Sequence, residues 1–143
     1  MDIIAKVKAL NFPTDQFVVM GSAILEMKGI RKAGDLDIIV TKELFEKMKS
    51  NPEWEYKREH GSVGNVVVEE LDNHQGIELY YDIYPTGGIA KFFADPTEIE
   101  VIDGINFASL LSLLKVKAEL WDREKDRQDA ELIRNYLALH TSA

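Results

Sequence analysis

The sequence predicts an α/β (α+β) domain with one mixed β-sheet, flanking helices and a C-terminal helical pair. Short apolar runs of strand length alternate with segments whose apolar residues recur at helical spacing. Their order is αβαβα, then a run of strands, then two helices. The length of 143 residues is typical of one domain. We therefore expect a single domain over 1–143, with a core at about 1–105 and a helical tail at about 106–143.

The first part of the chain alternates helices and strands. Apolar spacing and turn residues predict a helix at 2–10, a strand at 17–20, a helix at 23–28, a strand at 35–40 and a helix at 42–49. Ser22 is a suitable N-cap for the second of these helices, and Thr41 for the third. Gly29 and Asn51-Pro52 are expected to end those two helices.

The second part begins with three strand candidates and ends with two helices. The strands at 54–59, 63–71 and 77–84 are separated by turn residues, which favours an antiparallel meander, and 98–102 adds a further short strand. The two helices are expected at about 106–121 and 124–139. Apolar residues from Phe107 to Trp121 form a stripe at helical spacing that is typical of core.

Charge and composition exclude several classes of function. The net charge is 17 − 25 = −8, and the imbalance lies in 61–105, where Lys91 faces nine acids. Binding to nucleic acid through its backbone phosphates needs clustered Lys and Arg, so this distribution argues against it. The chain has no cysteine, no apolar run long enough to span a membrane and no visible signal peptide. We expect a cytoplasmic protein without a membrane partner.

A glycine-serine pair followed by two aspartates is the most informative pattern. Residues i and i+2 of a strand share a face, so Asp35 and Asp37 are expected to project together. Paired carboxylates suit Mg²⁺, and Gly21 and Ser22 at a helix start offer backbone N–H groups to an anion. A metal site beside a phosphate site is what nucleotidyl transfer requires. The structural alternatives are a solvated D-x-D and a plain turn with an N-cap.

Asp82 is a third candidate carboxylate. In the strand predicted at 77–84, alternation places Glu78, Tyr80, Asp82 and Tyr84 on one face. If this strand lies beside 35–40, Asp82 completes a cluster that can hold a metal or take a proton from an attacking hydroxyl. The alternative is a half-exposed strand whose polar face simply carries acids.

Residues 17–40, FVVMGSAILEMKGIRKAGDLDIIV, resemble the signature of the nucleotidyltransferase superfamily. That signature is an apolar strand, Gly-Gly or Gly-Ser, a helix, and Asp-x-Asp on the next strand, with a third carboxylate on a later strand that Asp82 matches. The segment LLSLLKVKAELWDREKDRQDAELI resembles the helical tail of small members, including the toxin-like AbiEii group. The matching positions there are Lys115, Ala118, Arg123, Lys125-Asp126 and Asp129.

The resemblance implies a minimal nucleotidyltransferase fold and a role for each matching residue. Gly21 and Ser22 would bind the triphosphate. Asp35, Asp37 and Asp82 would hold Mg²⁺ or Mn²⁺, and Asp82 would help to activate the acceptor hydroxyl. Many relatives have Arg-x-Thr-x-Asp-x-Asp, whereas this chain has no hydroxyl residue between its arginine and the first aspartate. This departure keeps the carboxylates but puts fine positioning in doubt.

The basic residues of the pattern are candidates for binding the nucleotide phosphates. Lys115 is favoured over Lys117 by its match to the motif, although a lysine beside an apolar stripe commonly extends to solvent. Arg31 and Arg123 are phosphate candidates, and a surface ion pair suits each of them equally well. The acids of the tail, Asp126 and Asp129, are expected to act as capping or dipole partners.

The leading hypothesis is a Mg²⁺-dependent enzyme that moves a nucleoside monophosphate from an NTP to a hydroxyl acceptor. The acidic middle of the chain favours a protein or a small molecule over a long nucleic acid as that acceptor. The resemblance also suggests a toxin–antitoxin setting, with an antitoxin or a target as protein partner. Two alternatives stand beside it: a non-catalytic module that binds a nucleotide or a protein, and an interaction protein that uses the acidic segment.

Overall fold

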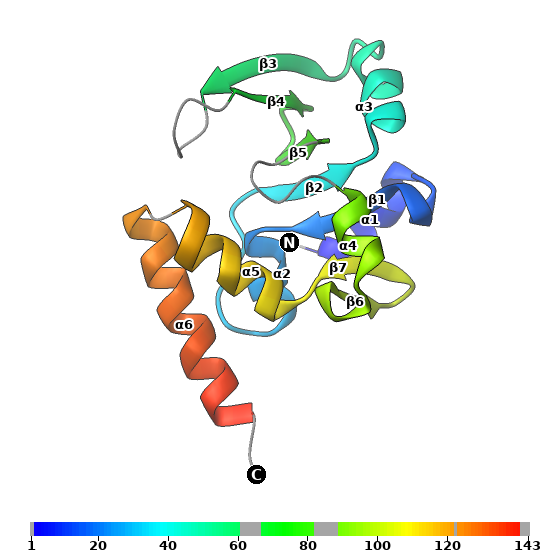
Figure 1. Cartoon of the computed structure of the whole chain (residues 1–143). Coiled ribbons are helices and arrows are strands. Elements are labelled where there is room, and N and C mark those ends of the chain that lie inside the picture. Colours follow the sequence, from blue (N-terminus) through cyan, green and yellow to red (C-terminus); the bar gives the residue numbers. More distant parts are fainter. Residues whose placement is uncertain (1, 61–66, 82–88, 122, 141–143) are drawn as a thin grey trace.

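A mixed seven-stranded sheet forms the centre of the molecule, as the sequence predicts. The computed structural model describes residues 2–60, 67–81, 89–121 and 123–140. The strand order is β3-β4-β5-β2-β1-β7-β6, which Figure 1 shows from top to bottom. The strands are β1 (Phe17–Met20), β2 (Leu36–Val40), β3 (Glu55–His60), β4 (Val67–Asp72), β5 (Ile77–Tyr80), β6 (Ile99–Ile102) and β7 (Ile105–Ala108).

The pairing of the strands has two parallel joints inside an otherwise antiparallel sheet. Strands β3, β4 and β5 form the predicted antiparallel meander. Strand β5 then lies parallel to β2, and β2 is antiparallel to β1. Strand β7 joins β1 in parallel and pairs with β6 in an antiparallel hairpin. The parallel joint between β2 and β5 is the one that builds the candidate site.

Helices flank the sheet, and α5 and α6 form a pair at one side of it (Figure 1). They are α1 (Ile3–Leu10), α2 (Ser22–Met27), α3 (Lys42–Lys49), α4 (Ile89–Ala94), α5 (Leu110–Lys115) and α6 (Glu124–His140), with a π-helical segment over Val116–Trp121. Thr41 caps α3 as predicted, accepting a hydrogen bond from the Leu44 N–H at 3.2 Å. Asp2 caps α1 and Ser109 caps α5 in the same way.

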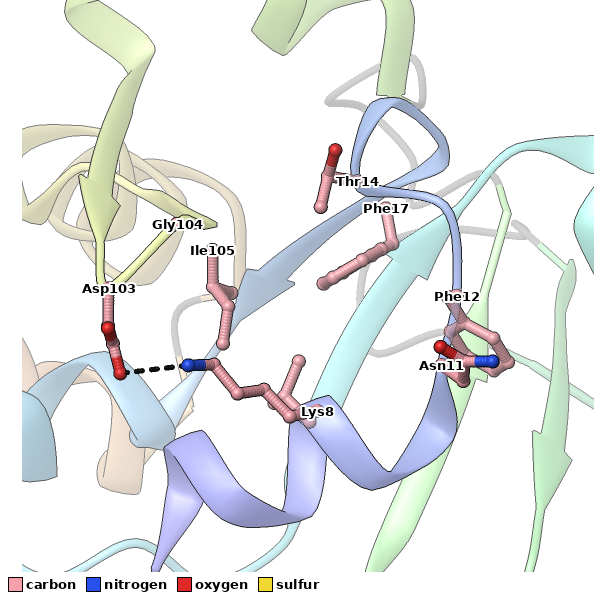
Figure 2. Close-up of a pocket in the computed structure, with 9 residues that line it drawn as sticks. Lys8, Asn11, Phe12, Thr14, Phe17, Asp103, Gly104 and Ile105 are labelled. Carbon is pink, nitrogen blue, oxygen red and sulfur yellow. Dashed lines mark hydrogen bonds and ion pairs between the residues drawn. The ribbon is translucent and has the colours of Figure 1, made fainter.

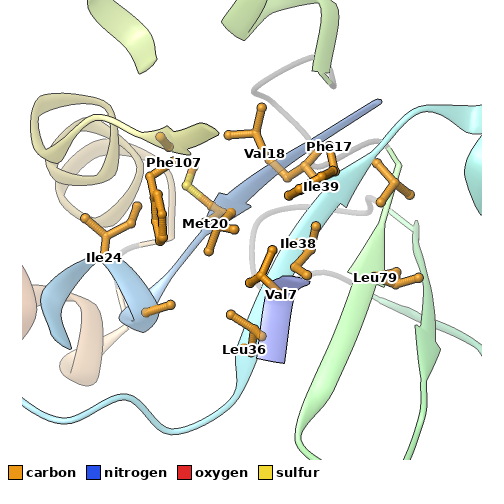
Figure 3. Close-up of a cluster of buried hydrophobic side chains, with 14 of the residues drawn as sticks. Val7, Phe17, Val18, Met20, Ile24, Leu36, Ile38, Ile39, Leu79 and Phe107 are labelled. Atoms are coloured by element: carbon orange, nitrogen blue, oxygen red, sulfur yellow. The ribbon is translucent and has the colours of Figure 1, made fainter. Parts of the chain in front are cut away.

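The core is assembled around the central strands. Every residue of β1 is buried, and so is every residue of β2 except Asp37. Val7 of α1, Leu79 of β5 and Phe107 of β7 belong to the same cluster, which Figure 3 shows. Burial of both faces explains why these short strands read as continuous apolar runs. A carboxylate within such a strand therefore needs its own explanation.

Two expectations about the second part of the chain are wrong. The segment expected to begin a helix at 106 is strand β7, because Ile105 and Phe107 are buried while Asn106 between them is not. The turn before it, Asp103-Gly104, has positive φ at both residues, which is the geometry of a tight hairpin. Helix α4 was not expected at all.

Among the described residues, no helix has the length and apolar character needed to cross a bilayer.

Candidate active site

Asp37 and Glu78 face each other across the parallel joint between β2 and β5. They are register partners, and paired residues of neighbouring strands project to the same side of the sheet. Asp37 is partly exposed in a strand whose other residues are buried, and Glu78 is partly exposed in β5. The sheet therefore presents two adjacent carboxylates on one face, held by two rigid strands.

Gly21 lies directly against this pair. It follows β1, whose last residue is the register partner of Asp37. Its backbone has φ 75° and ψ −152°, a conformation that side chains rarely adopt. A Cβ atom at this position would lie 2.7 Å from the Asp37 Oδ2 atom. Glycine is thus required twice here, by the backbone conformation and by the close approach of the carboxylate.

The electrostatics of Asp37 are unusual for an aspartate. Burial, the charges of Glu78 and Asp35, and a hydrogen bond with Glu78 together raise the pKa of Asp37 from its ordinary value to about 8. Lys125, at the start of α6, acts in the opposite direction. The side chain consequently holds a proton near neutral pH unless a cation offsets the neighbouring negative charge.

Tyr80 stands two residues beyond Glu78 on the same face of β5. Its hydroxyl donates a hydrogen bond of 2.6 Å to Glu78 Oε2. Burial, followed by the charge of Asp37, raises the pKa of Tyr80 well above its usual range. The phenol is therefore a hydrogen-bond donor that orients the Glu78 carboxylate.

The glycine-serine pair works differently from the expectation. Ser22 is not the N-cap of α2: Gly21 occupies the cap position, and α2 starts at Ser22. The Ser22 hydroxyl instead accepts from the Gly34 N–H at 3.2 Å and donates to the Asp35 carbonyl at 3.4 Å. Ser22 thus holds the segment that leads into β2. Asp35 is exposed and lies one residue before the strand, and its charge acts on Asp37.

The structure describes two of the three carboxylates expected to bind the metal, Asp35 and Asp37. Asp82 lies outside the described residues. Among the residues that are described, no group of three or more His, Cys, Asp or Glu side chains is arranged to hold a metal ion. The donors that do gather, Asp37 and Glu78 with Asp35 nearby, are all carboxylates, and this chemistry fits Mg²⁺ or Mn²⁺. Burial and these neighbours raise the pKa of Asp37, and a cation bound beside it would act in the opposite direction.

The candidate phosphate ligands of the tail divide into exposed and buried groups. Lys115 is exposed, and its amine lies 3.7 Å from a Glu98 oxygen. Lys117 is buried, with its amine 3.3 Å from Asp126 and 2.8 Å from Asp129. Lys125 is exposed and close enough to Asp37 to act on its charge. Of these three lysines, Lys125 is the one with a described electrostatic link to the carboxylates.

Both candidate arginines are engaged by acids of α6. The Arg31 guanidinium makes two hydrogen bonds to Asp129, of 2.8 and 2.7 Å. Arg123 donates from Nε to Asp126 at 2.6 Å, and it also feels the charge of Asp37. Asp126 and Asp129 are buried, and the pKa of each lies below its usual range because these cations and Lys117 outweigh the effect of burial. Asp126 also accepts a hydrogen bond from the Arg123 backbone N–H at 3.3 Å, directly before α6, so it caps that helix as expected. Both acids bind cations in addition, which was not expected.

A pocket of about 180 Å³ lies elsewhere, between α1 and the turn that joins β6 to β7. Figure 2 shows the Lys8–Asp103 ion pair of 3.2 Å at its rim. None of the candidate site residues lines it, and its volume is below the range typical of ligand sites. Its lining residues are Val7, Lys8, Asn11, Phe12, Thr14, Phe17, Asp103, Gly104 and Ile105.

Sequence reasoning missed Glu78, Tyr80 and Lys125 as members of this site. Alternation had already placed Glu78 and Tyr80 on the polar face of their strand, so the signal was present. The parallel register that sets Glu78 opposite Asp37 was not deducible from that alternation. Comparisons of the chain with protein-family models, curated proteins and solved structures find no match.

Proposed function

We propose that the protein is a divalent-cation-dependent nucleotidyltransferase. An acceptor hydroxyl attacks the α-phosphorus of an NTP, an O–P bond forms, and the bond to the β-phosphate breaks so that pyrophosphate leaves. The observation that carries the proposal is the Asp37 carboxylate, which lies against Gly21 and opposite Glu78 in the strand register. Carboxylates at close quarters beside a glycine that admits a close approach suit a cation and a phosphate together.

Each part of the site has a proposed task. Asp37 and Glu78 would hold the cation, and Asp35 would add its negative charge nearby. A bound cation would offset these charges and stabilise the attacking and leaving oxygens. Asp82, two residues beyond Tyr80 in the sequence, is proposed to join them and to take the proton of the acceptor hydroxyl. Gly21 leaves room for the triphosphate.

Two exposed lysines are proposed to bind the phosphates. Lys125 is the preferred candidate because its charge reaches Asp37. Lys115 is exposed and remains available as a second candidate. The acidic middle of the chain favours a hydroxyl of a protein or a small molecule as acceptor. The resemblance of the tail to the toxin-like group suggests an antitoxin or a target protein as partner.

Transfer of the α-phosphate tests the proposal. The protein is incubated with cell extract and each NTP labelled at the α-phosphate, with Mg²⁺ or with EDTA. We expect labelled product from at least one NTP with Mg²⁺ only, and a loss of about 1,000-fold or more in Asp37→Ala. The matched control is Asp15→Ala, which removes an exposed acid from the Thr14–Gln16 turn.

The same experiment separates the alternatives. A protein that melts at a higher temperature with an NTP but transfers no label is a nucleotide-binding module rather than an enzyme. Full activity in Asp37→Ala would overturn the assignment of the carboxylates. Absence of both transfer and any NTP-dependent shift in melting would reject nucleotide chemistry altogether.

A further inference from the structure

The strongest ion-pair network in the described structure joins the tail to the segment that carries Asp35. Lys117 and the two acids it contacts are buried, with side chains exposed by 3% for Lys117, 0% for Asp126 and 4% for Asp129. Asp129 also forms an ion pair with Arg31, and Asp126 forms one with Arg123. Two acids are thus shared among three cations, which leaves both carboxylates fully engaged.

Arg31 reaches this network from the segment between α2 and β2. Its guanidinium binds Asp129 through two parallel hydrogen bonds, an arrangement that fixes direction as well as distance. A third hydrogen bond, of 2.8 Å, runs from Arg31 to the Lys32 carbonyl. Arg31 therefore binds both the backbone of its own segment and Asp129 of α6.

The segment that follows Arg31 is fastened at two more points before it reaches the site. The Glu26 carboxylate accepts from the Ala33 N–H at 2.9 Å, and the Ser22 hydroxyl accepts from the Gly34 N–H. The next residue is Asp35. The Ser22 hydroxyl also donates to the Asp35 carbonyl at 3.4 Å, so these contacts restrain the backbone up to Asp35.

We infer that Arg31 and Asp129 are positioning residues: their ion pair latches the segment leading to Asp35 onto α6 and so fixes Asp35 beside Asp37. Arg31 then acts through Asp129 and not by binding phosphate. The inference rests on the proposed function, and it changes the role that the resemblance suggested for Arg31. Three of the five N–H donors of Arg31 are already used, and the Nε and Nη2 pair that could hold a phosphate through two bonds is occupied by Asp129.

A double-mutant cycle tests the latch. Arg31→Gln and Asp129→Asn are each expected to lower kcat at least tenfold, with the KM for the NTP changed by less than about threefold. Asp129→Asn also weakens the contact with Lys117, so its loss should be the larger one. Because Arg31 acts through Asp129, the double variant should lose no more than Asp129→Asn alone. Arg31→Lys should recover only part of the loss, since an ammonium cannot make the paired contact. The control is Arg127→Gln, which removes an exposed cation from the same helix.

Three kinetic results would overturn the inference. Additive losses in the double variant, or a raised KM with unchanged kcat in Arg31→Gln, would mean that Arg31 contacts the nucleotide directly. A loss as large in Arg127→Gln would mean that net charge alone matters. Circular dichroism and melting curves establish that each variant is folded before its kinetics are compared.

Hydrogen exchange tests the latch without any transfer activity. In Arg31→Gln, the backbone amides of Ala33 and Gly34 should exchange at least tenfold faster, whereas amides of the central strands should not change. Unchanged exchange at both residues would overturn the latch even in an active enzyme. Faster exchange in a protein that transfers no label would support the latch while rejecting the proposed function.

Discussion

Two groups of buried or half-buried carboxylates in this protein have opposite electrostatic character. Asp126 and Asp129 are surrounded by Lys117 and two arginines, and the pKa of each is lowered. Asp37 stands beside other carboxylates, and its pKa is raised to about 8. The first group is neutralised from within the chain. In the second, Lys125 only partly offsets the neighbouring acids, and under the proposed function a cation from outside would complete the neutralisation.

Removing the internal cation should have the largest effect on stability. Lys117→Met leaves two buried acids without their shared partner, and we expect the free energy of unfolding to fall by roughly 3–5 kcal/mol. Urea denaturation of the wild type and the variant measures the difference. The control is Lys115→Met, two residues away on an exposed side chain, which should change stability by less than about 0.5 kcal/mol. Equal losses of unfolding free energy in Lys117→Met and Lys115→Met would contradict the view that Asp126 and Asp129 are neutralised from within the chain.

Acid should weaken the internally neutralised group. Since the folded pKa values of Asp126 and Asp129 are lowered, their contribution is complete above about pH 5 and is lost as the pH falls below about 4. We expect unfolding free energies measured from pH 7 to pH 3 to decline at the acid end, by roughly 1–3 kcal/mol for these residues. The decline should be smaller in Asp129→Asn. If the unfolding free energy of Asp129→Asn declines in acid as much as that of the wild type, Asp129 is not a source of the pH dependence.

The second group should show the opposite dependence on pH. Because the folded pKa of Asp37 is raised, stability without metal should fall as the pH rises from about 4 to about 8. Asp37→Asn keeps the shape and a hydrogen-bond donor toward Glu78 without the charge. In EDTA at pH 8 it should be more stable than the wild type by roughly 1–3 kcal/mol. If Asp37→Asn is less stable than the wild type, the fold does not disfavour ionisation of Asp37, and the raised pKa is contradicted.

The smallest expected effect is stabilisation by the cation alone. Mg²⁺ at ten times its Kd should raise the free energy of unfolding of the wild type by about 1.4 kcal/mol. The same addition should leave Asp37→Asn unchanged, because the site has lost its charged ligand. Differential scanning calorimetry with Mg²⁺, and with Ca²⁺ for comparison, measures both. Equal shifts in the two proteins would place the cation elsewhere.

The sheet and most of its strands were predictable because their signals are local. Alternation marked Glu78 and Tyr80 as the polar side of β5, and Thr41 marked the start of α3. The hairpin of β6 and β7 also had a local signal, the Asp103-Gly104 turn, which the apolar stripe beginning at Phe107 obscured. A strand of four residues offers too few positions for its period to outweigh the helical pattern that follows it.

The site depends on information that local patterns do not contain. The sequence analysis considered that 77–84 lies beside 35–40, and the structure confirms this neighbourhood. Alternation does not give the register between two strands, so Asp37 could not be matched with Glu78 in advance. The burial of Lys117 has a similar origin. The segment Val116–Trp121 is π-helical, and its wider turn alters the direction in which each side chain points. An ordinary helical wheel gives the wrong face for a residue in such a segment.

The ion pair between Arg31 and Asp129 spans 98 positions of the sequence. On the ribosome the chain emerges from its N-terminus, so Asp35, Asp37 and Glu78 are synthesised well before α6. During that interval the carboxylates can already be brought together by β2 and β5, while the segment before Asp35 still lacks its anchor. The timing of translation would thus separate the assembly of the site from its alignment. A chain interrupted before α6 would contain the three carboxylates but not the ion pair that fixes Asp35.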